Sequence, residues 1–332
     1  MSIQIKFEFN LTIVKGKCAL PEKAEGLQKA NEVDVKKEPG VDFLAAAIEE
    51  VQKLKSVFSP STINNYQTAI RSFQKYLGGE DIHLDSICHD TMKSYERWLR
   101  DKGICLNTIS CYMRSLRSLL SKIQHGNDNG AFSQVYIGRM KTEKRSIPES
   151  EITRLKEVRL KPSSYMALVR DLFIFSFYAL GMPFVDIAFL RKDQIQNGIL
   201  TYERHKTGQR IKMRLEPCML DIINRYLIPD RPYVFPLLHS TIPKDAYNEY
   251  LSQLNRYNRS LKQLARIAAV DIPLTSYTPR HSWASIAFSH NVGIPVISKA
   301  LGHANPNNTL TYIREINDNR LYEANSYIVN CV

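Results

Sequence analysis

The sequence of 332 residues predicts a mainly α-helical protein with a small antiparallel β-sheet (α+β), divided between a helical domain and a mixed domain. Three observations support this fold class. Apolar residues recur at helical spacing through most of residues 43–301. Two short alternating segments, residues 199–204 and 210–215, flank a turn that contains Gly208. A polar stretch, residues 126–147, separates two apolar-rich regions, and chains of this length commonly hold two domains.

Residues 1–40 are predicted to form an N-terminal arm or linker. Residues 3–9 alternate apolar and polar side chains, which indicates a short strand, and residues 15–40 are polar and contain Pro21 and Pro39. The first forty residues carry seven Lys and six Asp or Glu. Because the whole chain has a net charge of +12, all but one of the excess positive charges belong to the rest of the chain. The basic character therefore comes from the folded body.

Residues 41–125 are predicted to form the helical domain. Ser59 and Thr62 can cap a helix whose apolar residues follow at helical spacing, and Gly78 ends it. Asn107 can cap another. The helices expected here span residues 43–58, 63–77, 91–102 and 107–123.

The helix expected over residues 107–123 has a basic face. Its cations are Arg114, Arg117 and Lys122. Its neighbouring hydroxyl-bearing residues are Ser110, Tyr112, Ser115 and Ser118. Such a face is either simply solvated or follows the phosphates of a nucleic acid, since basic and hydroxyl groups make most contacts to a DNA backbone. The basic linker over residues 126–147 adds three more candidate DNA-binding residues, Lys141, Lys144 and Arg145.

Residues 148–332 are predicted to form the mixed domain. The two alternating segments give its hairpin, and glycine in the turn between them tolerates an unusual backbone angle. The apolar pattern predicts helices over residues 165–180, 217–227, 244–269, 279–291 and 294–301, and either a turn or a short helix over residues 184–190.

Composition narrows the class of function. No stretch approaches the roughly 18 apolar residues that span a bilayer, and no signal peptide opens the chain, so no membrane partner is expected. The six cysteines lack metal-binding spacing, which favours reduced thiols in a cytoplasm and no structural zinc. The positive charge favours a nucleic-acid partner, although an ordinary basic soluble protein is the plain alternative.

The last fifth of the chain concentrates side chains that suit phosphate chemistry. They lie in residues 278–281 (Thr-Pro-Arg-His) and 301–303 (Leu-Gly-His), followed by Tyr312. A guanidinium such as that of Arg280 binds phosphate oxygens in pairs. A histidine can donate to the same oxygens or move a proton, and a tyrosine hydroxyl can act as a covalent nucleophile.

These segments resemble the tyrosine recombinase (phage integrase) family, and the resemblance covers roughly residues 41–332. The resemblance implies that Arg280 clamps the scissile phosphate, that His303 donates to one of its oxygens, and that Tyr312, nine residues later, is the nucleophile. Lys206, on the hairpin turn, would be the general acid for the leaving 5′-oxygen. Tyr277 stands where many members carry a histidine, and its phenol can still donate to an oxygen.

The resemblance also implies a function and partners. The protein would be a site-specific recombinase that integrates, excises or inverts DNA through a 3′-phosphotyrosyl intermediate, with no metal or other cofactor. A core-binding domain and a catalytic domain would clamp double-stranded DNA as a C shape. Four protomers would act on two duplexes, with residues 320–327 docking on a neighbour and accessory DNA-bending proteins as possible partners. The protein is expected in the bacterial cytoplasm, where it would associate with the nucleoid when it binds DNA.

One departure from the family pattern concerns its first catalytic arginine. Similar integrases place it immediately before, or two residues after, the glycine at 181, and here those positions hold Leu180 and Pro183. Arg170 lies about three turns earlier on the same helix, too far away to replace it directly. Arg191 and Lys192 follow the segment and are the remaining substitutes.

Two other functions stay open. Without a second cation the chain would be a DNA-binding relative that keeps the fold and the tyrosine but cleaves poorly. A type IB topoisomerase would share the chemistry and relax supercoils without a defined site, although the short chain and the core-binding domain favour a recombinase.

Overall fold

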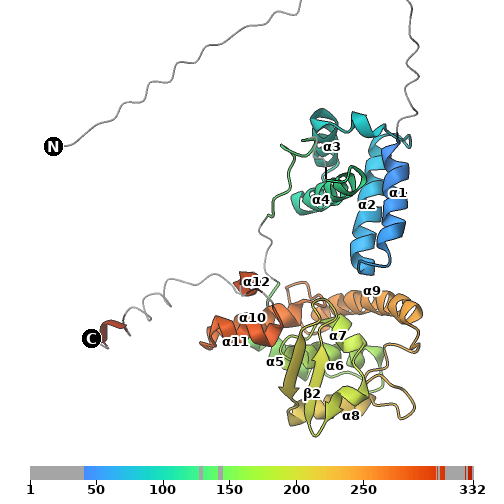
Figure 1. Cartoon of the computed structure of the whole chain (residues 1–332). Helices are drawn as coiled ribbons and strands as arrows, with labels where there is room; N and C mark the ends of the chain where they lie inside the picture. Colours follow the sequence, from blue (N-terminus) through green and yellow to red (C-terminus); the bar gives the residue numbers. More distant parts are fainter. Residues whose placement is uncertain are drawn as a thin grey trace, which may run out of the picture. The chain divides into compact units, whose positions relative to one another are not determined.

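The computed structural model describes residues 41–126, 130–140, 145–303, 305, 307–310, 326 and 328–330. The chain divides into two compact units, with the division between residues 140 and 141 (Figure 1). The described residues are mostly helical and include one three-stranded antiparallel sheet, so the predicted fold class is confirmed. The strand expected over residues 3–9 lies outside the described residues.

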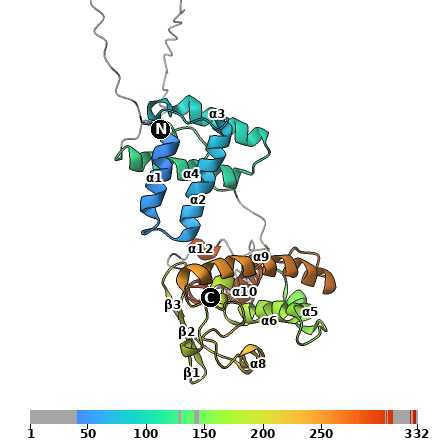
Figure 2. The ribbon, with the colours of Figure 1, turned by 90° about the vertical axis from the view of Figure 1, so that its right-hand side faces the viewer.

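The first unit is a small helical domain. Its helices are α1 (Phe43–Leu54), α2 (Pro60–Tyr76), α3 (His89–Asp101) and α4 (Leu106–Ile123), with a short 3-10 turn η1 (Leu84–Ser86). Helices α1 and α2 lie side by side, and both pack against α4 (Figures 1 and 2). The Ser59 hydroxyl accepts a hydrogen bond from the Thr62 amide at 3.4 Å, which caps α2 as its sequence predicts.

A buried carboxylate holds the segment that follows α4 against the first unit. Glu96, on α3, is 2% exposed and pairs with Lys93 at 3.2 Å and Arg100 at 2.6 Å. Its carboxylate also accepts the Tyr136 amide at 3.1 Å. The Asn107 side chain then pairs with both backbone groups of residue 140, at 2.8 and 3.1 Å. Much of the stretch whose composition resembles a linker is therefore packed on the first unit.

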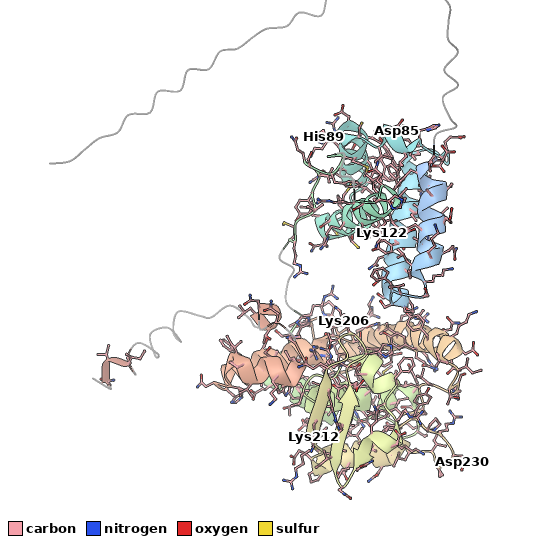
Figure 3. The ribbon with its side chains drawn as sticks, in the orientation of Figure 1. Asp85, His89, Lys122, Lys206, Lys212 and Asp230 are labelled. Carbon is pink, nitrogen blue, oxygen red and sulfur yellow. The ribbon has the colours of Figure 1, made fainter. Side chains whose placement is uncertain are left out.

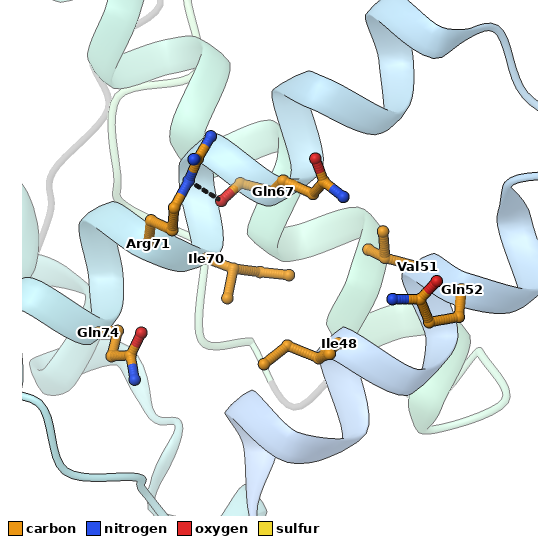
Figure 4. Close-up of a pocket in the computed structure, with 7 residues that line it drawn as sticks. All are labelled: Ile48, Val51, Gln52, Gln67, Ile70, Arg71 and Gln74. Atoms are coloured by element: carbon orange, nitrogen blue, oxygen red, sulfur yellow. Dashed lines mark hydrogen bonds between the residues drawn. The ribbon is translucent and has the colours of Figure 1, made fainter. Parts of the chain in front are cut away.

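An open groove lies between α1 and α2, with a volume of about 310 Å³ (Figure 4). Its lining residues are Ile48, Val51, Gln52, Gln67, Ile70, Arg71 and Gln74. It contains none of the candidate site residues.

The second unit is built around one buried helix. This helix is α6 (Tyr165–Tyr178), and the helices that pack against it are α5 (Glu149–Glu157), α7 (Phe184–Ala188), α8 (Pro217–Tyr226), α9 (Pro243–Ile267) and α10 (Thr278–Ser289). Two more helices, α11 (Ile294–Leu301) and α12 (Asn307–Leu310), follow α10. Each predicted helix of the described residues is present, with ends shifted by a few residues.

The sheet has the order β1 (Ile195–Gln196), β2 (Ile199–Glu203), β3 (Arg210–Arg214), and a 3-10 turn η2 (Lys192–Gln194) precedes it. Strands β2 and β3 pair antiparallel with Tyr202 opposite Ile211. Alternate residues of both strands are buried, as the sequence pattern predicts. The two-residue β1 was not predicted, because such a short strand leaves no alternating pattern.

Within the described part of the chain, no helix combines the length and the apolar character needed to cross a bilayer.

Candidate active site

The start of α10 fixes the position of Arg280. The buried Thr278 hydroxyl accepts a hydrogen bond from the Thr275 amide at 2.9 Å. The next amide, that of Ser276, donates to the Asn258 side chain on α9 at 2.9 Å. These two hydrogen bonds fix the backbone that leads into α10. Arg280 lies in the first turn of this helix, with 2% of its surface exposed.

Arg280 joins three segments that are distant in the sequence. Its Nη1 donates to the Gly181 carbonyl at 3.0 Å, and its Nη2 donates to the Leu301 carbonyl and lies 3.1 Å from His303 Nε2. Gly181 has φ +68°, and a Cβ placed on it would lie 2.7 Å from the Arg280 Cα. Only glycine allows this approach between the end of α6 and the start of α10.

The contacts of His303 define its protonation. A guanidinium only donates, so His303 Nε2 accepts from Arg280 and the ring proton sits on Nδ1, 3.0 Å from the Thr309 hydroxyl. Burial, followed by the charges of Arg280, Arg204 and Lys206, lowers the pKa of His303 to about 4. The imidazole is therefore neutral near pH 7.

A second buried arginine stands beside the first. Arg204 follows β2, is 7% exposed, and donates from Nη1 to the carbonyls of Leu301 at 2.7 Å and Gly302 at 3.3 Å. Its Nε lies 3.5 Å from Asp186 Oδ2, and Asp186 also accepts the His205 amide at 2.9 Å. Burial raises the pKa of Asp186, while the His205 amide and the nearby cations oppose that rise.

Sequence reasoning missed both Arg204 and Asp186. A signal for the arginine was present, because Leu200 and Tyr202 are the buried residues of β2 and position 204 continues their register. An arginine on the inward side of a strand needs buried acceptors and a compensating charge, and here two carbonyls accept its hydrogen bonds while Asp186 pairs with its charge. No comparable pattern marks Asp186, whose short helix α7 is almost entirely buried.

Lys206 lies on the β2–β3 turn (Figure 3). The turn is closed by the Gly208 amide, which donates to the Arg204 carbonyl at 2.8 Å, and Gly208 takes φ +65°. The Lys206 side chain is exposed, and its charge contributes to the low pKa of His303. The turn therefore presents an ammonium group within electrostatic reach of the histidine.

Tyr277 directly precedes α10 and is 47% exposed, three residues ahead of Arg280. The structure thus brings Arg280, His303 and the Lys206 turn together, with Tyr277 at the start of the same helix. The nucleophile candidate Tyr312 lies outside the described residues.

The substitutes considered for the missing arginine are bonded elsewhere. Arg170 pairs with Asp171 at 2.8 Å and donates to the Val158 carbonyl at 2.8 Å. Arg191 pairs with Asp193 at 3.2 Å. Lys192 donates to the carbonyls of Ile228 and Pro229. Leu180, at φ +58°, is half-buried against the core of this unit.

The candidate DNA-binding residues differ in their surroundings. On α4, Arg114 and Arg117 are exposed, while the Lys122 ammonium lies 5.6 Å from the centre of the Phe58 ring (Figure 3). Ser110 and Ser115 are buried, so the prediction that their hydroxyls belong to the basic face is wrong. Both serines lie among the buried residues of α4, together with Ile109, Met113, Leu116, Leu119 and Leu120. Arg145 is exposed in the second unit, and Lys141 and Lys144 lie outside the described residues.

Among the residues that the structure describes, no group of three or more His, Cys, Asp or Glu side chains is placed to hold a metal ion.

Comparison with known proteins assigns the family. The model of the phage integrase SAM-like domain matches residues 42–123, and the model of the phage integrase family matches residues 146–318, a little over half of the chain. The chain belongs to the phage integrase family. This match confirms the resemblance to tyrosine recombinases that the motifs in residues 277–312 indicate.

Relatives and solved structures agree with this family. Tyrosine recombinase XerA of Pyrococcus furiosus is 26% identical over 222 residues, which are 65% of this chain and 72% of the relative. A lambda integrase dimer bound to a COC′ core site matches with a TM-score of 0.65 at 15% identity, over 83% of this chain and 98% of that chain. A lambda integrase tetramer bound to a Holliday junction matches with a TM-score of 0.63 at 14% identity, over 84% and 80%. At these identities the structural likeness supports the fold.

Proposed function

We propose that this chain is a site-specific DNA recombinase that breaks and rejoins DNA through a 3′-phosphotyrosyl intermediate. The observation that supports it best is the buried guanidinium of Arg280, held against Leu301 and His303 beside the Lys206 turn. Phosphoryl transfer needs such preorganised cations, because its transition state spreads extra negative charge over the phosphate oxygens.

In the proposed step the phenol oxygen of Tyr312 forms a bond to the scissile phosphorus, and its proton passes to water. The bond between phosphorus and the 5′-oxygen breaks, and the Lys206 ammonium protonates that oxygen, which leaves as a 5′-hydroxyl. Arg280, His303 and Tyr277 hold the non-bridging oxygens. A 5′-hydroxyl from a partner strand then reverses the step. Because the phosphotyrosyl bond conserves the energy, the scheme needs no ATP. It assigns the balancing of the phosphate charge to side-chain cations and uses no metal.

The histidine changes tautomer in this scheme. In the structure His303 Nε2 accepts from Arg280, so it has no proton to give to a phosphate oxygen. When the phosphate takes over the Arg280 donors, the proton moves to Nε2, and the Thr309 hydroxyl turns to donate to Nδ1. A hydroxyl serves both states, because it donates as well as accepts.

The proposed substrate is double-stranded DNA, as in the lambda integrase complexes. Residues 41–125 would act as the core-binding domain and residues 148–332 as the catalytic domain. Residues 126–147 would be the basic linker between them, although residues 131–140 pack on the first unit. The exposed Arg114 and Arg117 of α4, with Lys122 and Arg145, would contact phosphates. A homotetramer on two duplexes is proposed by analogy with the lambda integrase tetramer.

A second candidate function rests on Leu180. The family arginine is absent there, so the chain would bind DNA and cleave it poorly. An arginine on a phosphoryl-transfer transition state is worth roughly 10³–10⁵ in rate. DNA binding depends on many dispersed contacts and would persist.

The test uses a library of duplexes of randomised sequence, each nicked so that a short 5′-hydroxyl fragment diffuses away after cleavage. Covalent adducts are isolated on denaturing gels, and the attached strands are sequenced to identify the cleaved site. The recombinase is expected to give adducts at a defined site that Tyr312→Phe abolishes. Tight binding without any adduct supports the second candidate. Relaxation of supercoiled plasmid without a preferred site would indicate a topoisomerase.

A further inference from the structure

The site contains one buried arginine that the proposed chemistry does not use. We propose that Arg204 donates from Nη2 to a non-bridging oxygen of the scissile phosphate, and so supplies the second guanidinium that position 180 lacks. This assignment rests on the proposed recombinase function. It makes Arg204 a catalytic residue and Asp186 the residue that positions it.

The first support is the placement of the two guanidinium groups. Arg204 and Arg280 both donate to the carbonyl of Leu301, so their donor nitrogens lie within two hydrogen-bond lengths of each other. A phosphate that reaches Arg280 is therefore also near Arg204. The charge of Arg204 already acts on His303, where it contributes to the low pKa of the imidazole.

The second support is that only part of the Arg204 guanidinium is engaged by other groups of the protein. Nη1 is bound to the carbonyls of Leu301 and Gly302. Nε lies 3.5 Å from Asp186 Oδ2, an ion-pair contact in which neither atom makes a hydrogen bond to a described residue. Nη2 makes no hydrogen bond to any residue in the described ranges. Because a guanidinium is planar, fixing Nη1 and Nε also fixes the direction in which Nη2 donates.

The third support is the packing that holds this arginine in place. Gly302 has φ +62°, and a Cβ on it would lie 2.6 Å from Arg204 Cδ. The arginine stem therefore runs directly along the backbone of the Leu301–His303 segment. Asp186 is 5% exposed and is itself held by the His205 amide at 2.9 Å. Such preorganisation lets a cation stabilise developing charge without moving first.

The experiment uses the cleavage site found by the library selection, in two forms of the nicked duplex. One form carries the natural scissile phosphate, and the other carries a methylphosphonate, in which a methyl group replaces a non-bridging oxygen and removes the negative charge. The full-length protein is compared with Arg204→Gln and Arg204→Lys. Arg214→Gln is the matched control, because Arg214 is an exposed arginine of the same hairpin. Thermal unfolding and DNA-binding measurements accompany each variant.

On the natural phosphate, Arg204→Gln is expected to lower the rate of adduct formation by roughly 10³-fold or more, as for other phosphoryl-transfer arginines. Arg204→Lys, which keeps the charge, is expected to lose less, and Arg214→Gln should match the wild type. On the neutral methylphosphonate the loss in Arg204→Gln should shrink by at least about tenfold, because the charge that the guanidinium balances is gone. Adding Leu180→Arg to Arg204→Gln should restore part of the rate on the phosphate.

The proposal is overturned if Arg204→Gln cleaves the phosphate as fast as the wild type. It is also overturned if its loss is equal on phosphate and methylphosphonate, since a purely structural arginine would slow both alike. If Arg204→Gln does not fold, Arg204→Lys on the two substrates decides by the same comparison. An absence of adduct from the wild type would instead remove the recombinase function on which the proposal rests.

Discussion

At the scale of single residues, the proposed site buries a guanidinium that would have to contact a phosphate. Arg280 is held by backbone carbonyls and by a neutral histidine. Because none of these partners carries a negative charge, the guanidinium keeps its full positive charge. A buried charge is tolerable only when such acceptors satisfy it. The carbonyls of Gly181 and Leu301 therefore both stabilise the arginine and fix the orientation of its guanidinium. Glycine at position 181 allows the two backbones to approach closely enough for this.

The close approach at Gly181 leads to a prediction about Gly181→Ala. The added methyl group would lie 2.7 Å from the Arg280 Cα, at a backbone φ of +68°. We expect this variant to lose adduct formation and, from strain at that φ alone, about 1–3 kcal/mol of unfolding free energy. Gly198→Ala is the control, because Gly198 has φ +73° but a methyl group added to it would meet nothing within 4 Å. Urea unfolding should show a smaller loss in Gly198→Ala, and equal losses would argue against the contact.

The low pKa of His303 predicts a pH dependence of stability. Between about pH 6.5 and 4 the unfolded chain binds a proton at this histidine that the folded protein does not. The unfolding free energy should therefore fall as the pH falls through this window, and the contribution should level off below pH 4. One proton limits the slope to about 1.4 kcal/mol per pH unit, and partial exposure of the ring keeps it lower.

The measurement compares urea unfolding of the wild type and His303→Gln across this pH range. The difference in stability between the two should change with pH across this window. A constant difference between wild type and His303→Gln would contradict a depressed pKa.

At the scale of elements, the sequence specified the helices well and the local detail of the site poorly. Apolar residues at helical spacing predicted the long helices of the described residues that bury one face, and α6, which is buried on nearly all sides, was predicted from its strongly apolar run. The segments around Arg280 and His303 could be recognised from their spacing. Arg204 was missed although its register on β2 points inward, because its acceptors are carbonyls supplied 97 and 98 positions later. Asp186 was missed because its role depends on Arg204 and no pattern marks it.

Glu96 carries a prediction for the first unit. Replacing it with glutamine keeps an acceptor for the Tyr136 amide but removes the charge that pairs with Lys93 and Arg100. Because hydrogen bonds to a buried charge are worth about 1.5–3 kcal/mol, Glu96→Gln should lower the unfolding free energy by an amount in that range. Residues 131–140 should also become easier to cleave with protease. Glu49→Gln, at an exposed pair with Lys53, should change little, and a similar loss there would contradict the account.

At the scale of the whole molecule, the chain combines two units whose families both belong to phage integrases. The excess charge lies in the folded body, and DNA affinity is expected to come from many phosphate contacts in both units. The two guanidinium groups proposed for catalysis, Arg204 and Arg280, are buried, whereas Lys206 and the candidate DNA-binding arginines of α4 are exposed. Binding and cleavage should therefore respond to different substitutions.

This separation predicts the behaviour of Arg114→Gln and Arg117→Gln. Each should weaken DNA binding and reduce the slope of log affinity against log salt by about 0.9, the value for one lost phosphate contact. Titrations at several salt concentrations measure this slope. Lys53→Gln, on α1, is the control and should leave it unchanged. Unchanged slopes in both arginine variants would mean that the α4 face is merely solvated.

The central claim is that Tyr312 forms the covalent bond to DNA, and the most direct test is to identify the residue that carries the attached nucleotide. Adducts trapped on the nicked duplex are digested with nuclease and protease, and the peptide that keeps a nucleotide is identified by mass spectrometry. The expected result is a 3′-nucleotide on Tyr312, with no labelled peptide from Tyr312→Phe. A nucleotide on any other of the 17 tyrosines, or an adduct that survives Tyr312→Phe, would contradict it.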